Sequence, residues 1–265
     1  MVKTIIQHKP TRLFIILSGF FITNALIAEF IGVKIFSLEQ TLGLKPAEIS
    51  LFGSKYSFNL TCGVLLWPVV FVMTDIINEY YGRKGVKFLS WMAIGLIAFG
   101  FIMVFTAIQT MPNSWWVTSR QEIGIENMND SFNAIYGQGL GIILASMTAF
   151  LVAQLVDVFV FHRIKRATGE KRIWLRATGS TVISQLIDSF IVLLIAFYFY
   201  PKWVPGQGAA WPLDQVLAIC IVNYIYKFTM ALILTPVIYL VHGWIENYLG
   251  KDLATEMKRA AMESR

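Results

Sequence analysis

Six apolar runs of about 20 residues or more dominate the sequence. At a rise of ~1.5 Å per residue, such a run forms a helix that crosses the ~30 Å apolar core of a bilayer. Because 56% of the 265 residues are hydrophobic and only 14% are charged, little sequence is left for a soluble domain. The sequence therefore predicts an all-α, polytopic membrane protein with six transmembrane helices in one bundle. The expected spans are residues 13–36, 60–78, 88–109, 140–161, 175–198 and 216–241.

Lys and Arg are concentrated before the first span, after the second, after the fourth and at the end of the chain. With six spans, these four groups fall on one side, which the positive-inside rule makes the cytoplasm. Both termini are then cytoplasmic, and the net charge of +6 belongs to loops, so nucleic-acid binding is not expected. The groups are Lys3, Lys9 and Arg12; Arg83, Lys84 and Lys87; Arg163, Lys165, Arg166, Lys171, Arg172 and Arg176; and Lys251, Lys258 and Arg259.

Three parts of the chain follow from this orientation. We expect a cytoplasmic N-terminal segment at residues 1–12, a six-span domain at 13–241 and a cytoplasmic tail at 242–265. The tail alternates in charge with an amphipathic pattern, which is typical of a solvated helix.

Two nonapeptides, 151–159 (LVAQLVDVF) and 182–190 (VISQLIDSF), repeat Gln, Leu, Asp and Phe in register within the apolar runs. Gln and Asp stand three residues apart in each copy, so Gln154 and Asp157 share one helix face, as do Gln185 and Asp188. An ionised group at membrane depth costs at least ~2.5 kcal/mol and usually marks a pathway. The alternative is that each carboxylate bonds a neighbouring helix and only holds the bundle together.

Other polar side chains interrupt the spans at two depths. A shallow tier near the cytoplasmic ends combines the second-span stripe of Thr74, Asp75, Asn78 and Glu79 with Gln154 and Asp157. A deeper tier holds Asn24, Gln185, Asp188 and Lys227. Lys227 is the costliest of these to leave unpaired and stands level with Asp188, so we expect the two to interact, directly or through a solute. A fixed charge pair is the open alternative.

This set of side chains suits a neutral, planar solute that is rich in hydrogen-bonding groups. A guanine-like edge offers two adjacent N–H donors to one carboxylate, for which Asp188 is the first choice, and amides such as Gln bind both donors and acceptors. Aromatic rings at Trp67, Phe190, Tyr224 and Tyr226 could sandwich the base or merely pack the bundle. No Walker motif, zinc-ligand spacing or nucleophile elbow is present, so no cofactor or metal is expected.

Four runs carry a resemblance to a known family: 74–84 (TDIINEYYGRK), 153–161 (AQLVDVFVF), 174–190 (WLRATGSTVISQLIDSF) and 223–240 (NYIYKFTMALILTPVIYL). They resemble the queuosine precursor transporter family of the vitamin uptake transporter group, from about residue 13 to 240. The resemblance implies import of 7-cyano-7-deazaguanine and related 7-deazaguanines across the inner membrane by a multi-pass protein. Carried over by position, its site residues are Asp75, Asn78, Glu79, Gln154, Asp157, Gln185, Asp188, Asn223 and Lys227.

Three classes of function stay open at this stage. The first is a transporter that acts alone, with carboxylates that could couple uptake to protons. The second is the substrate-binding subunit of a multicomponent vitamin or nucleobase importer, for which Ala25 and Ala28 on the first span are a candidate docking surface. An enzyme is not expected, because His8, His162 and His242 all lie outside the predicted spans. The partners are a small-molecule substrate and membrane lipid, and a homodimer is an open alternative.

Overall fold

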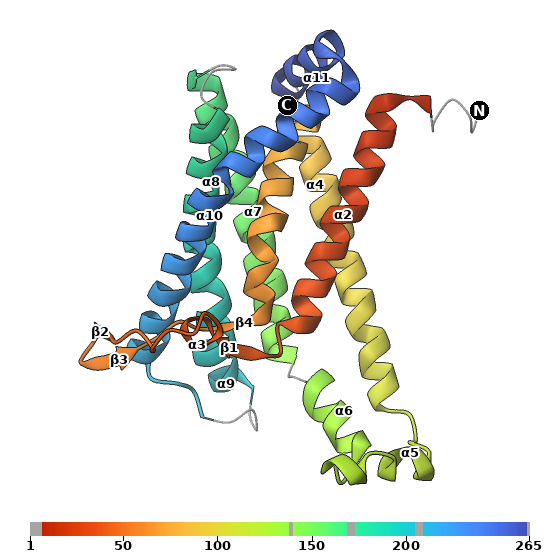
Figure 1. The fold of residues 1–265 in the computed structure, drawn as a ribbon, viewed down its shortest axis with the longest axis vertical. Helices are drawn as coiled ribbons and strands as arrows, with labels where there is room; N and C mark the ends of the chain where they lie inside the picture. The colour runs from red at the N-terminus through yellow and green to blue at the C-terminus, as the bar shows by residue number, and fades with distance from the viewer. Residues whose placement is uncertain (1–6, 138–139, 169–172, 205–208, 264–265) are drawn as a thin grey trace.

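The protein is an elongated bundle of helices in a computed structural model that describes residues 7–137, 140–168, 173–204 and 209–263 (Figure 1). Within these residues, five helices are long and apolar enough to cross a membrane. The prediction of an all-α polytopic membrane protein is confirmed at this level. The five are α2 (Lys9–Ile31), α4 (Trp67–Ile108), α7 (Leu140–Thr168), α8 (Ile173–Leu193) and α10 (Leu213–Leu249).

The longest of these helices, α4, covers two of the six predicted spans. At Gly82 the backbone leaves the helical region with φ 67° and ψ −170°, a combination that is essentially restricted to glycine. From this point the two arms of α4 run in opposite directions, first upward and then downward in Figure 1. Gly82 therefore allows a reversal with almost no loop.

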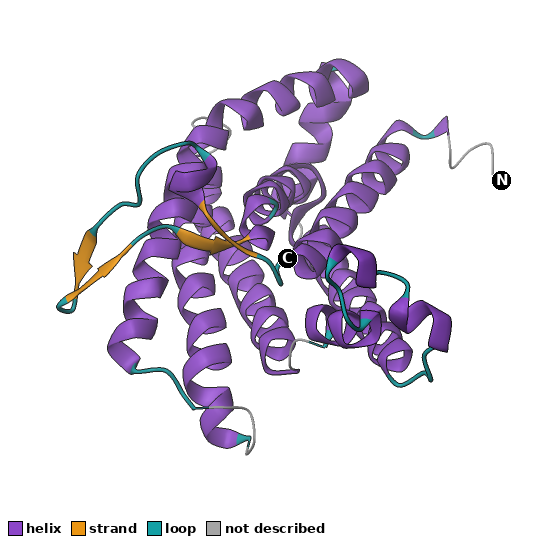
Figure 2. Ribbon diagram, turned by 60° about the horizontal axis from the view of Figure 1, so that its bottom comes forward, coloured by secondary structure: helices purple, strands orange, loops and turns teal. Residues whose placement is uncertain are grey.

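The connections at the end of the bundle opposite both termini contain short strands, where the sequence predicted only an outer loop (Figures 1 and 2). β1 (Ile35–Ser37) pairs antiparallel with β4 (Asn59–Thr61), and β2 (Ile49–Leu51) pairs antiparallel with β3 (Ser54–Tyr56). The other short elements are α3 (Leu38–Thr41), η1 (Cys62–Leu65), α5 (Ser114–Thr118), η2 (Gln121–Ile123), α6 (Met128–Tyr136), the π-helical η3 (Leu194–Phe199) and α9 (Tyr200–Trp203).

Glu39 holds the connection between β1 and β4 together. Its carboxylate accepts backbone N–H groups from Ala47 at 3.1 Å and Phe58 at 2.8 Å. Burial raises the pKa of Glu39, but these hydrogen bonds favour the ionised form more strongly, so the pKa lies below its ordinary value.

The C-terminal helix α11 (Lys251–Glu263) packs against the bundle, which corrects the expectation of a solvated tail. Ala254, Lys258 and Ala261 are buried on its inner face, and Lys258 forms an ion pair with Glu246 at the end of α10. The apolar side of this amphipathic helix packs against α4 near Tyr80. Its docking leaves only the outer face in water.

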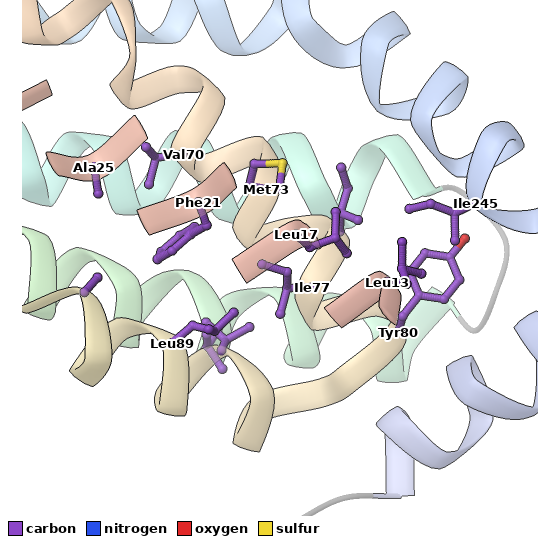
Figure 3. Close-up of a cluster of buried hydrophobic side chains, with 14 of the residues drawn as sticks. Leu13, Leu17, Phe21, Ala25, Val70, Met73, Ile77, Tyr80, Leu89 and Ile245 are labelled. Carbon is purple, nitrogen blue, oxygen red and sulfur yellow. The ribbon is translucent and has the colours of Figure 1, made fainter. Parts of the chain in front are cut away.

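The main hydrophobic core lies where α2, the two arms of α4 and α7 meet, as the close-up in Figure 3 shows. Small residues allow close helix approach: a Cβ at Gly63 would lie 2.5 Å from the Ala28 carbonyl oxygen. Ala25 and Ala28 are 0% and 1% exposed. The core includes Leu13, Leu17, Phe21, Val70, Met73, Ile77, Tyr80, Leu89, Phe150 and Ile245.

Candidate functional site

Three buried side chains, which we call the closed cluster, join α4, α7 and α8. Glu79 accepts hydrogen bonds from Arg176 Nε at 3.0 Å and Nη2 at 2.6 Å, while Lys165 Nζ lies 3.0 Å from the same carboxylate. The side chains of all three residues are 1% exposed. Since both carboxylate oxygens bind cations, Glu79 has little capacity left for a solute and mainly ties three helices together.

Several residues assigned to loops by the sequence lie inside the bundle instead. Lys165 was expected among the charges of a connection, and His162 and His242 outside the spans, yet all three are buried. His162 Nε2 donates to Asn78 Oδ1 at 2.8 Å. The reason is that α7 and α10 continue well past the predicted ends of their spans, so these residues extend the packed helices.

Hydroxyl groups along α8 hold two carboxylates from neighbouring helices. Asp75 accepts hydrogen bonds from Ser180 at 3.4 Å and Thr181 at 3.1 Å, and Asp157 accepts one from Ser184 at 3.1 Å. Since Ser184 lies three and four residues beyond the other two, both carboxylates face the same side of α8. In the described part of the chain, neither carboxylate has an ion-pair partner.

Four side chains, which we call the open cluster, carry buried polar atoms that have no hydrogen-bond partner among the described residues. These atoms are Asn78 Nδ2, Gln154 Oε1, Asp157 Oδ2 and both amide atoms of Gln185. Gln154 Nε2 does donate, to Thr74 Oγ1 at 2.9 Å. A buried polar atom without a partner costs about 1–3 kcal/mol, so such atoms are rare in folded proteins and are available to a ligand.

Asp188 and Lys227 form an ion pair between α8 and α10, as the sequence predicted. Their side chains are 14% and 6% exposed, so the buried lysine has a counter-charge.

The two remaining predicted site residues hydrogen-bond to their own helices. Asn24 donates to the Phe20 carbonyl at 2.8 Å, and Asn223 donates to the Ile219 carbonyl at 3.0 Å. Asn24 is buried in α2, and it lines neither of the cavities described next, whereas Asn223 lines the larger one.

Two cavities flank Lys227. The smaller has a volume of about 10 Å³, enough for one water, and brings Asp75 together with Thr181, Gln185 and Lys227. It thus joins side chains that the sequence placed at two different depths. The larger has a volume of about 290 Å³ and lies between α2, the second arm of α4, α6, α8 and α10.

The aromatic rings named from the sequence line neither cavity. Trp67 packs on Phe150, with 5.3 Å between ring centroids, and Tyr226 lies in a small core cluster with Leu60. Phe190 and Tyr224 are also absent from both linings.

Sequence reasoning missed the hydroxyl groups of α8 and, in the larger cavity, Glu29 and Ser189. The run Thr178–Ser180–Thr181–Ser184 could have been found, because its spacing puts hydroxyls on one face of an apolar helix. Glu29 gave a weaker signal, since it lies near the outer end of its span. No group of three His, Cys, Asp or Glu residues in the described ranges is placed to hold a metal ion.

Comparison with known proteins supplies the family. The model of a family described as "Putative vitamin uptake transporter" matches residues 61–241. This chain belongs to that family of vitamin uptake transporters. The match covers both repeats and all of the closed and open clusters, and the resemblance found in the sequence is confirmed.

Three curated relatives are similar to this chain, and all three are named as queuosine precursor transporters. The chain is 29% identical over 200 residues to a probable queuosine precursor transporter of Bacillus subtilis, covering 75% of this chain and 77% of the relative. It is 24% identical over 221 residues to the queuosine precursor transporter of Escherichia coli, covering 83% and 86%. A probable queuosine precursor transporter of Haemophilus influenzae is 25% identical over 195 residues, 71% of this chain and 73% of the relative. No solved structure matches the chain.

Proposed function

We propose that this protein imports queuosine precursors, namely 7-cyano-7-deazaguanine and related 7-deazaguanines, across the inner membrane. The observation that carries the proposal is the open cluster: buried carboxylate and amide atoms without described partners, of which Gln185 lines the smaller cavity together with Lys227. The names of the three relatives give the same substrate class.

The donors and acceptors of these side chains match a 7-deazaguanine. The amino group and ring N–H of the base are adjacent donors for carboxylate or amide oxygens, and its carbonyl accepts from an amide N–H. Asn78, Gln154, Asp157 and Gln185 offer both kinds of atom. The ten predicted residues form the proposed transport path, in which Glu79 holds the helices and the open cluster meets the solute.

Six crossings with both termini in the cytoplasm complete the proposal. The reversal at Gly82 supports the count, since it lets α4 cross twice. Lys84 and Lys87, just after the reversal of α4, and Arg163, in the C-terminal part of α7, are exposed. The reversal of α4 and helix α11 lie at the same end of the bundle, which supports the orientation (Figure 1). A reporter fused after Leu240 should be active only in the cytoplasm; activity on the outer side would contradict this topology.

The deciding experiment is binding and transport by the purified chain. We expect 7-cyano-7-deazaguanine to bind, guanine to bind more weakly and vitamins not to bind. In liposomes that contain this chain alone, the labelled base should accumulate or equilibrate. Binding without transport would favour the substrate-binding subunit of a multicomponent importer instead. That alternative has lost its candidate docking surface, because Ala25 and Ala28 are buried within the chain.

Proton coupling is the second part of the proposal. Asp75 and Asp157 face the same side of α8 and lack a described cation, and such carboxylates at membrane depth are typical of proton relays. An inwardly directed gradient of one pH unit should raise accumulation by up to about tenfold for each coupled proton. Asp157→Asn should remove this response, whereas Asp130→Asn on the exposed face of α6 should keep it. Equal uptake with and without the gradient would mean facilitated diffusion.

A further inference from the structure

The larger cavity has the features of a chamber for one small planar molecule. Its volume of about 290 Å³ is at the lower end of the range for ligand pockets. Ile35, Thr61 and Tyr136, which belong to connections at the end of the bundle opposite both termini, form part of its wall (Figure 1). Lys227 lines this cavity and the smaller one alike, so it stands between the outer chamber and Asp75.

Aromatic rings from four elements surround the chamber. Phe30 on α2, Phe101 on α4, Tyr136 on α6 and Phe197 on η3 all line it. Phe30 and Phe101 lie in contact, with 5.6 Å between ring centroids. Such rings can hold the flat faces of a base from different sides. The π-helical segment η3 contributes Phe197, and insertions of this kind are frequent at functional sites.

The polar groups of the chamber differ from those that the sequence favoured. Glu29 lines it, and its carboxylate accepts a hydrogen bond from the Ser146 hydroxyl. Ser189, 1% exposed, also lines it, and its hydroxyl has no hydrogen-bond partner among the described residues. Asp188 lines neither cavity, and Lys227 already occupies its carboxylate.

We propose that the chamber is the outer binding site for the 7-deazaguanine, reached before the open cluster on the other side of Lys227, and that in it Glu29, rather than Asp188, recognises the amino and ring N–H groups. This assignment rests on the proposed function and names the residue that gives it specificity. The hydroxyl of Ser146 contacts one Glu29 oxygen, and no described residue donates to the other, which can accept from the base. Lys227 and Asn223 line the same chamber and carry donors for the ring carbonyl. Asp188 then serves to position the Lys227 ammonium group.

The test compares two ligands on matched variants. 7-Cyano-7-deazaguanine carries the amino group, and 7-cyano-7-deazahypoxanthine lacks it but keeps the rest of the ring. The parent protein should prefer the amino-bearing ligand by about tenfold or more, because a hydrogen bond to a charged group is lost with the analogue. Glu29→Gln should bring the ratio of the two dissociation constants close to one. Glu48→Gln, in the exposed pair with Lys55, is the matched control and should keep the parent's ratio.

Asp188→Asn supplies an independent measurement should Glu29→Gln fold poorly. Its overall affinity should fall because Lys227 loses its partner, while the preference for the amino-bearing ligand persists. A parent ratio retained in Glu29→Gln, or lost in Asp188→Asn, would overturn the assignment while leaving the proposed function intact. A parent protein that binds neither ligand would overturn the proposed function and this assignment with it.

Discussion

The closed and open clusters lie on the same three helices and are built from similar residues. They differ in how many of their polar atoms have a hydrogen-bond or ion-pair partner. In the closed cluster, one carboxylate binds two cations and every oxygen is used. In the open cluster the side chains are equally buried, but each has at least one carboxylate or amide atom that lacks a partner within the described residues. The difference separates two uses of polar groups in an apolar bundle: groups with partners hold helices together, and we propose that groups without partners bind the solute.

Breaking the closed cluster should have the largest effect on stability. Glu79→Gln leaves Lys165 and Arg176 buried around a neutral group, which should cost about 3–5 kcal/mol of unfolding free energy. Thermal unfolding in detergent would measure the loss. Glu48→Gln, which removes an exposed pair, should change stability by less than about 1 kcal/mol. Equal effects of the two substitutions would mean that the closed cluster is not a structural anchor.

The pair of Asp188 and Lys227 lies between these extremes, since it is buried but lines the cavities through Lys227. Asp188→Asn and Lys227→Met should each destabilise the protein, and the double substitution should be milder than their sum by roughly 0.5–3 kcal/mol. A double-mutant cycle of thermal unfolding measures this coupling. Additive losses would show that the two charges do not depend on each other.

In the open cluster, substitution should affect binding more than stability. Gln185→Leu removes two buried amide atoms that have no described partner, so unfolding free energy should stay within about 1 kcal/mol or rise. Affinity for 7-cyano-7-deazaguanine should fall roughly tenfold, and Gln185→Glu should weaken binding less. A stability loss as large as that of Glu79→Gln would remove the distinction between the clusters.

The smallest effect is expected outside the bundle, at Glu39. Because its folded pKa lies below the ordinary value of 4.5, its ionised form stabilises the connection fully above that pH. This contribution is lost as pH falls below 4.5 toward the folded pKa. The protection of residues 35–61 against hydrogen exchange, corrected for the intrinsic pH dependence of exchange, should therefore fall on acidification. In Glu39→Gln this fall should be absent.

The sequence by itself determined the membrane class, the family and the pairing of Asp188 with Lys227. Apolar runs long enough to cross a bilayer admit few other structures, because backbone groups in lipid must be satisfied within helices. The pairing could be predicted because an unpaired lysine at membrane depth costs free energy, and Asp188 was the carboxylate at the same depth. The repeated Gln and Asp likewise identified α7 and α8 as the helices that carry polar groups.

Only the tertiary structure decided which polar groups have hydrogen-bond or ion-pair partners within the protein and which do not. The one-dimensional pattern gave Glu79, Asp157 and Gln185 the same standing, because helical spacing reports the face of a residue and says nothing of its neighbours. Whether a polar atom has a partner depends on contacts between distant segments, such as Arg176 with Glu79 and Ser184 with Asp157. The chamber around Glu29 arises in the same way, from side chains of nine helices and strands whose packing no local pattern contains.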